Sequence, residues 1–317
     1  MKIKLRKSFI CGIKGLKLSP KESSFIRRHK PWGIILFERN IKNIKQTQRL
    51  TNSIRKIFKD SKYPILIDEE GGKVSRIRNI VDTSIFTGSY FGNLYKKNIK
   101  KFNLYYQVYI NQISYVLNLI GVNINTVPVL DLRREFTNPI IGNRSFSKNK
   151  KIVNQIGVKN INLFNKKKIA TVIKHIPGHG LAKEDSHIKL PYISSKLSYL
   201  KKNDFQLFKN KKSLFAMTAH IIFDSIDNKN CITHSKDAIN FIRKEIRFKN
   251  LIITDDISMK ALKYSFKINV KKAYNAGCNL VLHCNGNIKE MNKLAKIAPS
   301  LNSFIIKKTS EFYNLLS

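Results

Sequence analysis

Several residue types are scarce in this sequence of 317 residues, and each scarcity excludes a class of protein. The only cysteines are Cys11, Cys231, Cys278 and Cys284, and their spacing fits neither a disulfide framework nor a CxxC metal knuckle. The longest apolar runs, such as Ile34–Phe37, are far shorter than the roughly 20 residues that span a bilayer. A hydrophobic content of 42% is nevertheless enough for a large core, which excludes global disorder.

The beginning of the sequence, from Met1 to Lys7, is basic. No apolar stretch of signal-peptide length and no small-residue cleavage site follows it. Few and widely spaced cysteines are typical of a reducing compartment. We therefore expect a cytoplasmic protein. No internal repeat and no linker rich in Pro, Gly or Ser divides the chain.

Acidic residues are scarce as well, since 20 Asp and Glu stand against 60 Lys and Arg, a formal net charge of +40. Such a charge is typical of nucleic-acid-binding proteins. The lysines are dispersed, however, and come with Ile and Asn, as in residues 97–101 and 148–152. A binding surface would gather its basic residues on one helix or arm. We interpret the charge as compositional drift toward residues with AT-rich codons, and the positions that keep an acid become informative.

Short β-branched runs alternate with longer segments of helical character along the chain. Most runs are apolar on consecutive positions, as in strands buried on both faces of a parallel sheet. The eight runs are Phe9–Ile13, Gly33–Phe37, Pro64–Asp68, Val122–Val127, Ile169–His175, Leu214–His220, Leu251–Asp256 and Asn279–Cys284. Apolar residues recur at helical spacing between them, for example at Leu104, Val108, Tyr115 and Leu119. This alternation predicts an α/β fold, a (β/α)8 barrel of the TIM type, with an open doubly wound sheet as the alternative.

Polar residues close several of the apolar runs. Asp68, His175, His220 and the pair Asp255 and Asp256 stand where a predicted strand ends. Active sites of (β/α)8 barrels lie at the carboxyl ends of the strands. The sequence therefore predicts a site at the mouth of the barrel.

The segment after the fifth run contains Pro, Gly, His and acidic residues, a composition suited to folding over a ligand. Asp185 and His187 can hydrogen-bond each other, which would fix the imidazole tautomer and stabilise its charged form. His187 could then give and take a proton near neutral pH. The alternative is a metal site in which His175 and His179 join this pair. We favour acid/base chemistry, because Pro177 and its neighbouring Gly disfavour the helix that would bring His175 and His179 together.

Three further positions offer charged groups. Asp255 and Asp256 end the seventh run, and a carboxylate held there is a credible nucleophile for a glycosyl centre, although one member of this pair could instead cap the next helix. Asp68 precedes a Gly-Gly turn that returns Arg76 toward the strand end, and its carboxylate could accept hydrogen bonds from sugar hydroxyls. Arg144 is a charged donor within a loop.

Taken together, these motifs resemble glycoside hydrolase family 3, and more closely its bacterial β-N-acetylglucosaminidases of peptidoglycan recycling. The resemblance extends in the family's order from Gly33 to Cys278. It is carried by Lys-His-x-Pro-Gly-His-Gly followed by Asp-Ser-His, by Asp-x-Glu-Gly-Gly, by Gly-Asn-Arg-Ser-Phe-Ser and by Thr-Asp-Asp-x-Ser-Met. The departures are Glu69 in place of Gln, Lys73 in place of Arg, and Glu38 before Arg39 and Asn40. None is at a catalytic position, although Glu69 would add a charge near the sugar.

The resemblance implies a function and residues that perform it. It implies a single barrel domain over residues 1–317, with Asp255 as nucleophile, His187 as acid/base and Asp185 as its partner. The residues expected to hold N-acetylglucosamine are Asp68, Arg76, Arg144, Lys174 and His175. The expected reaction is retaining hydrolysis of terminal, non-reducing β-linked N-acetylglucosamine from anhydro-muropeptides, by a monomer without a metal or organic cofactor.

Two alternatives to hydrolysis stay open. One is a phosphorylase of the same family, because a His acid/base does not repel an incoming phosphate and the positive charge of the chain would attract it. The other is a nucleic-acid-binding protein on a decayed barrel, which would require the site residues to be broken, and they are intact.

Overall fold

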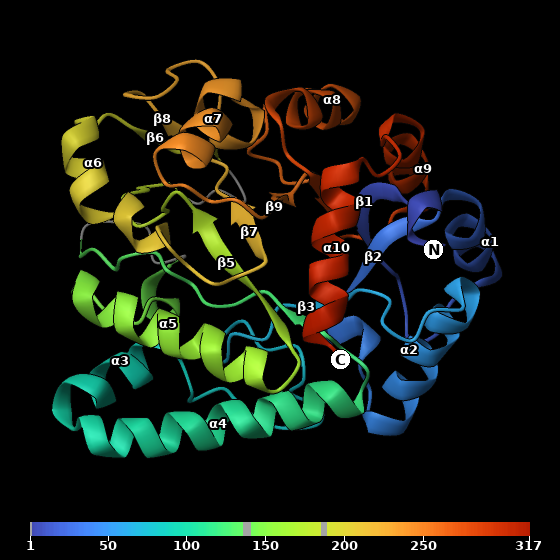
Figure 1. Cartoon of the computed structure of the whole chain (residues 1–317), viewed down its shortest axis with the longest axis horizontal. Helices are drawn as coiled ribbons and strands as arrows, with labels where there is room; N and C mark the ends of the chain where they lie inside the picture. Colours follow the sequence, from blue (N-terminus) through green and yellow to red (C-terminus); the bar gives the residue numbers. More distant parts are fainter. Residues whose placement is uncertain (1, 136–140, 185–188) are drawn as a thin grey trace.

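The computed structural model describes residues 2–135, 141–184 and 189–317 (Figure 1). Eight strands close into a parallel barrel in which β6 and β8 take no part. The barrel strands are β1 (Lys7–Gly12), β2 (Pro31–Leu36), β3 (Ile65–Ile67), β4 (Ile124–Asn125), β5 (Ala170–Ile176), β7 (Phe215–Thr218), β9 (Leu251–Asp256) and β10 (Leu280–His283). All eight predicted runs overlap a barrel strand, so the predicted barrel is confirmed and the open sheet is wrong.

Helices surround the barrel and connect its strands. The α-helices are α1 (Pro20–His29), α2 (Ile44–Phe58), α3 (Gly88–Lys97), α4 (Ile99–Leu119), α5 (Lys150–Lys166), α6 (Leu197–Asn203), α7 (Lys236–Lys244), α8 (Phe266–Ala276), α9 (Ile288–Ile297) and α10 (Ser303–Leu315). Short 3-10 turns are η1 (Lys2–Leu5), η2 (Glu38–Asn40), η3 (Gly142–Arg144), η4 (Phe205–Phe208) and η5 (Ile232–His234), and β6 (Tyr192–Ile193) pairs with β8 (Ile222–Phe223). Within the described ranges, no helix combines the length and the apolarity that crossing a membrane requires.

The strands bury side chains on both faces, which explains their continuous apolar runs. One set of alternate residues fills the barrel interior, among them Leu66, Val172 and Ile253. The other set, such as Ile65 and Ile67, packs outward against the helices. Barrel closure thus makes two apolar layers from one sequence pattern.

Helix α10 covers the end of the barrel opposite the mouth. Trp32 of β2 donates a hydrogen bond from its indole Nε1 to Thr309 Oγ1 at 2.9 Å, and both residues are buried. Phe312 packs against Trp32 and Phe215 with ring centroids 6.4 and 5.7 Å apart. The apolar side of α10 therefore forms the floor of the interior core.

Helix α4 forms where it was predicted, but the apolar stripe that indicated it faces outward. Its buried side consists instead of Tyr106, Ile110, Ile113 and Leu117, with neighbouring residues. The stripe residues Leu104, Val108 and Tyr115 are exposed. The sequence of the helix has no charged residue after Lys101, and apolar residues lie on both of its sides, so spacing alone could not identify the buried one.

Candidate active site

A cavity of about 120 Å³ opens at the carboxyl ends of the barrel strands. Its lining brings together six of the predicted site residues, namely Asp68, Arg76, Arg144, Lys174, His175 and Asp255. The remaining lining residues are Glu70, Val74, Ile141, His179, Met217, Leu282 and Cys284. Asp185 and His187, the predicted acid/base pair, lie outside the described residues.

Strand register brings three of these residues to the mouth. Side chains two positions apart in a strand point to the same side. Leu66, Val172 and Ile253 fill the interior. Asp68, Lys174 and Asp255 follow them by two residues and point into the cavity just above the core. The apolar residues of each strand therefore fix the direction of the polar residue that ends it.

Lys174 and Arg144 both bind Glu70, a residue that the sequence-based prediction missed. Arg144 donates from Nε and Nη2 to the two Glu70 oxygens at 2.7 and 2.8 Å. The Lys174 Nζ lies 2.6 Å from Glu70 Oε1 and 3.2 Å from Asp68 Oδ1. Burial alone would raise the pKa of Glu70, but the two cations outweigh burial and hold it far below its usual range. Glu70 is therefore an anion that keeps both cations in place.

Asp68 is shared between cations and a hydroxyl. It accepts a hydrogen bond from Thr126, and its Oδ2 lies 3.7 Å from Arg76 Nη2. Burial opposes ionisation of Asp68, but Lys174 and then Arg76 lower the pKa of its carboxyl below the usual value. Thr126 was also missed, although it follows the interior residue Ile124 by two positions, which is the same signal that found Asp68.

Glu69 does not add a charge to the cavity, contrary to the expectation from sequence. Its carboxylate is buried under the loop that carries Arg76. There it accepts hydrogen bonds from the backbone N–H of Arg76 at 2.7 Å and from the hydroxyls of Ser75 and Thr83 at 3.1 and 3.0 Å. Glu69 is the middle one of three consecutive acids and faces away from the mouth. Its hydrogen bonds therefore order this loop.

The two aspartates that end β9 have different surroundings. The Asp255 carboxylate lines the cavity and accepts the Asp256 backbone N–H at 2.8 Å. The Asp256 carboxylate instead accepts from Ser258 Oγ at 2.8 Å and from the backbone N–H of Cys284 at 3.1 Å. Asp256 therefore ties the turn after β9 to the end of β10 and does not cap a helix.

Asp255 is ionised at neutral pH. Burial would raise the pKa of its carboxyl, but the imidazoles of His220 and His175 outweigh burial and lower it. His220 is itself buried, which lowers its pKa. Its Nε2 lies 3.1 Å from the Asp256 carbonyl oxygen and its Nδ1 lies 2.8 Å from Thr233 Oγ1. His220 thus holds the end of β9 through the Asp256 carbonyl, and the Asp255 carboxylate faces the cavity.

Asp131 anchors the beginning of the segment that follows β5. It accepts hydrogen bonds from His175 Nδ1 and from the His179 backbone N–H, both at 2.7 Å. Burial would raise its pKa, but His175 lowers it below the usual value. Asp131 was not among the predicted site residues, because nothing in sequence spacing shows that the loop after β4 reaches His175. In the described ranges, no group of three or more His, Cys, Asp and Glu is placed to bind a metal ion.

Asp204 packs against Gly178 in the segment that follows β5. It pairs with Arg134 at 2.9 Å, and a Cβ at Gly178 would lie 3.1 Å from the Asp204 Cβ. Gly178 has φ +145°, so both its backbone and its surroundings favour glycine there. Burial raises the pKa of Asp204 to about 6, although Arg134 opposes that shift. The ion pair links the loop after β4 to the junction between α6 and η4.

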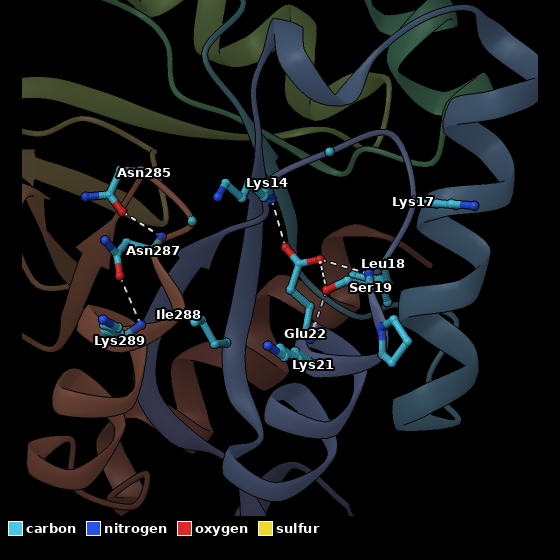
Figure 2. Close-up of a pocket in the computed structure, with 13 residues that line it drawn as sticks. Lys14, Lys17, Leu18, Ser19, Lys21, Glu22, Asn285, Asn287, Ile288 and Lys289 are labelled. Atoms are coloured by element: carbon cyan, nitrogen blue, oxygen red, sulfur yellow. Dashed lines mark hydrogen bonds between the residues drawn. The ribbon is translucent and has the colours of Figure 1, made fainter.

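A second and larger hollow of about 1180 Å³ is lined in part by Asn285, the chain neighbour of the cavity residue Cys284 (Figure 2). It lies between the loops after β1 and β10. Its basic lining residues are Lys14, Lys17, Lys21 and Lys289. Its one acid, Glu22, is buried and accepts hydrogen bonds from the backbone N–H groups of Lys14 and Ser19 at 2.8 and 2.9 Å. The hollow therefore offers more positive than negative charge.

Comparisons with known proteins agree with this geometry. The chain is 31% identical over 290 residues to a beta-hexosaminidase of Haemophilus influenzae, a match that covers 88% of this chain and 79% of the relative. It is 29% identical to beta-hexosaminidase A of Pseudoalteromonas piscicida, but spans only 48% of that relative's length. NagZ from Neisseria gonorrhoeae, solved in complex with N-trifluoroacetyl-D-glucosamine, superposes with a TM-score of 0.84 at 26% identity, over 97% of this chain and 90% of that one.

A family-level match agrees with these relatives. The family described as "Glycosyl hydrolase family 3 N terminal domain" matches residues 6–308, which include the whole barrel. The sequence motifs, the closed barrel and the relatives all lead to the same conclusion. The chain belongs to glycosyl hydrolase family 3.

Proposed function

We propose that the protein is a retaining exo-β-N-acetylglucosaminidase, a β-N-acetylhexosaminidase that acts as one catalytic domain over residues 1–317. The observation that carries the proposal is the ionised carboxylate of Asp255 in a cavity whose other walls hold hydrogen-bonding cations and acids. The relatives named beta-hexosaminidase, which match 84% to 95% of this chain, support the same reaction.

Asp255 is the proposed nucleophile. An oxygen of its carboxylate attacks the anomeric carbon as the bond to the leaving oxygen breaks, which forms a covalent glycosyl ester. His187, supported by Asp185, donates a proton to the leaving oxygen. In the second step His187 takes a proton from water, which attacks the anomeric carbon and releases the sugar with its original configuration. A nucleophile must be ionised, and the lowered pKa of Asp255 satisfies this condition.

The remaining cavity residues are proposed to hold the sugar. Asp68 can accept hydrogen bonds from sugar hydroxyls, while Lys174, Arg76 and Arg144 can donate them. Glu70 keeps Lys174 and Arg144 in fixed positions, so that both cations are already in place before the sugar binds. His175 is held by Asp131 and faces the same space.

We further propose that the substrate is a peptidoglycan fragment and that the enzyme works in the cytoplasm. N-acetylglucosamine would occupy the cavity and the rest of the fragment would extend from it. The hollow beside Cys284 has the size and positive charge to accept an acidic group attached to the leaving sugar. Peptidoglycan peptides carry free carboxylates, which fits such a surface.

The test is an assay with p-nitrophenyl N-acetyl-β-glucosaminide, with p-nitrophenyl β-glucoside as the matched control. The proposal expects release of nitrophenolate from the first substrate and little from the second. Adding phosphate and identifying the product separates the reactions, because hydrolysis gives N-acetylglucosamine and phosphorolysis gives its 1-phosphate. If the protein cleaves neither aryl substrate and does not cleave an anhydro-muropeptide, the proposal is overturned.

A further inference from the structure

An aromatic side chain lies beside one of the cations at the mouth of the barrel. Phe37 follows the interior residue Ile35 by two positions, so its side chain points to the same side as Ile35. It is half-buried and packs against the interior core. Leu36 of β2 pairs with Ile67 of β3, so the residues that come next, Phe37 and Asp68, are neighbours. Phe37 therefore lies where the interior core meets the candidate sugar site.

Two arginines approach the Phe37 ring. The guanidinium carbon of Arg39 lies 4.6 Å from the ring centroid, and that of Arg76 lies 5.5 Å from it. Both distances are within the roughly 6 Å over which an aromatic face attracts a cation. Arg39 has a further anchor, since its Nε donates to the Ile13 carbonyl oxygen at 2.9 Å. Among the described residues, the cavity lining includes Arg76 but not Phe37, so Phe37 can act on a sugar only through a neighbour.

The Arg76 guanidinium is held differently from the other two cations of the cavity. Glu70 binds Arg144 at 2.7 Å and Lys174 at 2.6 Å. In contrast, Arg76 Nη2 is 3.7 Å from Asp68 Oδ2, which is longer than a hydrogen bond. Within the described ranges, the buried Nε of Arg76 has no hydrogen-bond partner. In this part of the chain, no carboxylate takes up these N–H groups of Arg76.

The backbone of Arg76 is fixed separately from its side chain. Glu69 accepts the backbone N–H of Arg76 at 2.7 Å and that of Ile77 at 3.3 Å. A long side chain that is fixed only at its backbone still samples several rotamers. A carboxylate would order the guanidinium but would occupy its N–H donors. An aromatic face attracts the guanidinium and leaves those donors free to bind a ligand.

We propose that Phe37 is a positioning residue for sugar binding, whose ring holds the Arg76 guanidinium at the cavity wall with N–H donors free for sugar hydroxyls. The inference rests on the proposed function, in which Arg76 donates to the bound N-acetylglucosamine. Glu70 orders two of the cavity cations through ion pairs, and Phe37 orders the third through its aromatic face. A Leu at position 37 would keep the apolar contact with the interior core and lose the attraction for the cation.

The test compares variants of Phe37 in the hydrolysis of p-nitrophenyl N-acetyl-β-glucosaminide. Phe37→Leu should raise KM about three- to tenfold, as expected for the loss of one cation–π contact. It should leave kcat nearly unchanged, because an interaction made equally with substrate and transition state affects KM alone. The inhibition constant of N-acetylglucosamine should rise by the same factor. Phe37→Tyr retains the aromatic face and should behave like the wild type.

Phe241→Leu is the matched control. Phe241 on α7 is also half-buried, and Lys201 Nζ lies 5.4 Å from its ring centroid. It is not among the described residues that line the cavity, so its replacement should change neither KM nor the inhibition constant. If Phe37→Leu does not fold, as judged by its melting curve, Phe37→Met takes its place, because Met also packs in a core without an aromatic face.

A double-mutant cycle tests whether Phe37 acts through Arg76. Arg76→Met removes the cation and should itself raise KM. When Phe37→Leu is added to Arg76→Met, KM should rise no further, whereas two independent effects would multiply. A merely structural role of Phe37 would instead lower the melting temperature and kcat in both backgrounds.

The outcomes separate this inference from the proposed function. A wild type that cleaves no substrate overturns both. Wild-type turnover together with an unchanged KM in Phe37→Leu overturns the positioning role alone. So does a KM that multiplies in the double variant, or a rise in Phe37→Tyr as large as that in Phe37→Leu.

Discussion

The guanidinium of Arg144 binds both carboxylate oxygens of Glu70, at 2.7 and 2.8 Å, in a site where neither side chain is more than slightly exposed. This bidentate pair joins the loop after β3 to η3, which lies in the connection between β4 and α5. Lys174 of β5 completes it at 2.6 Å from Glu70. One acid therefore orders two cations that line the candidate sugar site.

Replacing Glu70 with Gln should lower both stability and substrate affinity. The change leaves the buried Lys174 and Arg144 without their shared anion, and breaking a buried pair in this way costs about 3–5 kcal/mol. We expect a loss of unfolding free energy of that order in urea titrations, together with a raised KM. Glu245→Gln is the control, because Glu245 pairs with Lys201 at 2.8 Å on the exposed surface and should change neither quantity measurably.

Asp255 and Asp256 should respond differently to the same substitution. Asp255→Asn removes the charge that attacks the anomeric carbon and should reduce kcat by several orders of magnitude while the melting temperature changes little. Asp256→Asn weakens contacts with Ser258 and Cys284, so it should lower the melting temperature and reduce activity far less. Activity and thermal unfolding of both variants are the measurements. The opposite ranking of activities would move the nucleophile to Asp256.

His187→Ala should reveal an acid/base role through its dependence on the leaving group. A sugar hydroxyl needs a proton to leave and nitrophenolate does not. Cleavage of a natural disaccharide should therefore nearly cease, while the aryl substrate should form the ester on Asp255 and accumulate it. Azide needs no general base and should restore turnover as the β-glycosyl azide. Asp185→Asn should give a weaker form of the same pattern. A common loss on both substrates without azide rescue contradicts the assignment.

Asp204 should make stability depend on pH in a direction opposite to most carboxylates. Its folded pKa of about 6 lies above the ordinary 3.8, so the folded protein binds a proton before the unfolded chain does. Relative to Asp204→Asn, the wild type should gain stability as the pH falls from about 6 to about 4, and lose it as the pH rises again. Urea unfolding of both proteins at the two pH values gives the difference. An equal response in both proteins would show that Asp204 does not titrate in this range.

Much of the barrel and part of the site followed from the sequence, because both depend on strand pattern. Buried parallel strands are apolar on both faces, so each run could be found from composition alone. The polar residue that ends a run enters the mouth when it follows an interior residue by two positions, as Asp68 follows Leu66. The same rule places Asp255 two residues after Ile253.

The residues that were missed are those whose direction depends on loops. Three acids follow β3 in succession, and only the fold of the next loop turns Glu69 under it and Glu70 toward Arg144. Asp131 reaches His175 from another loop, a contact that no local pattern contains. In α4 both sides carry apolar residues at helical spacing, so the period indicated a helix but not which side packs inward.

The position of α10 has a consequence for the order of events during synthesis. Trp32 and Phe215 belong to strands made early and midway, but the helix that covers them is made after every barrel strand. A chain still on the ribosome would hold a ring of strands whose lower aromatic layer is open to water. Contacts between residues so far apart in sequence form slowly, and exposed apolar surface invites aggregation. The interval before α10 emerges is therefore when this aromatic layer is open to aggregation.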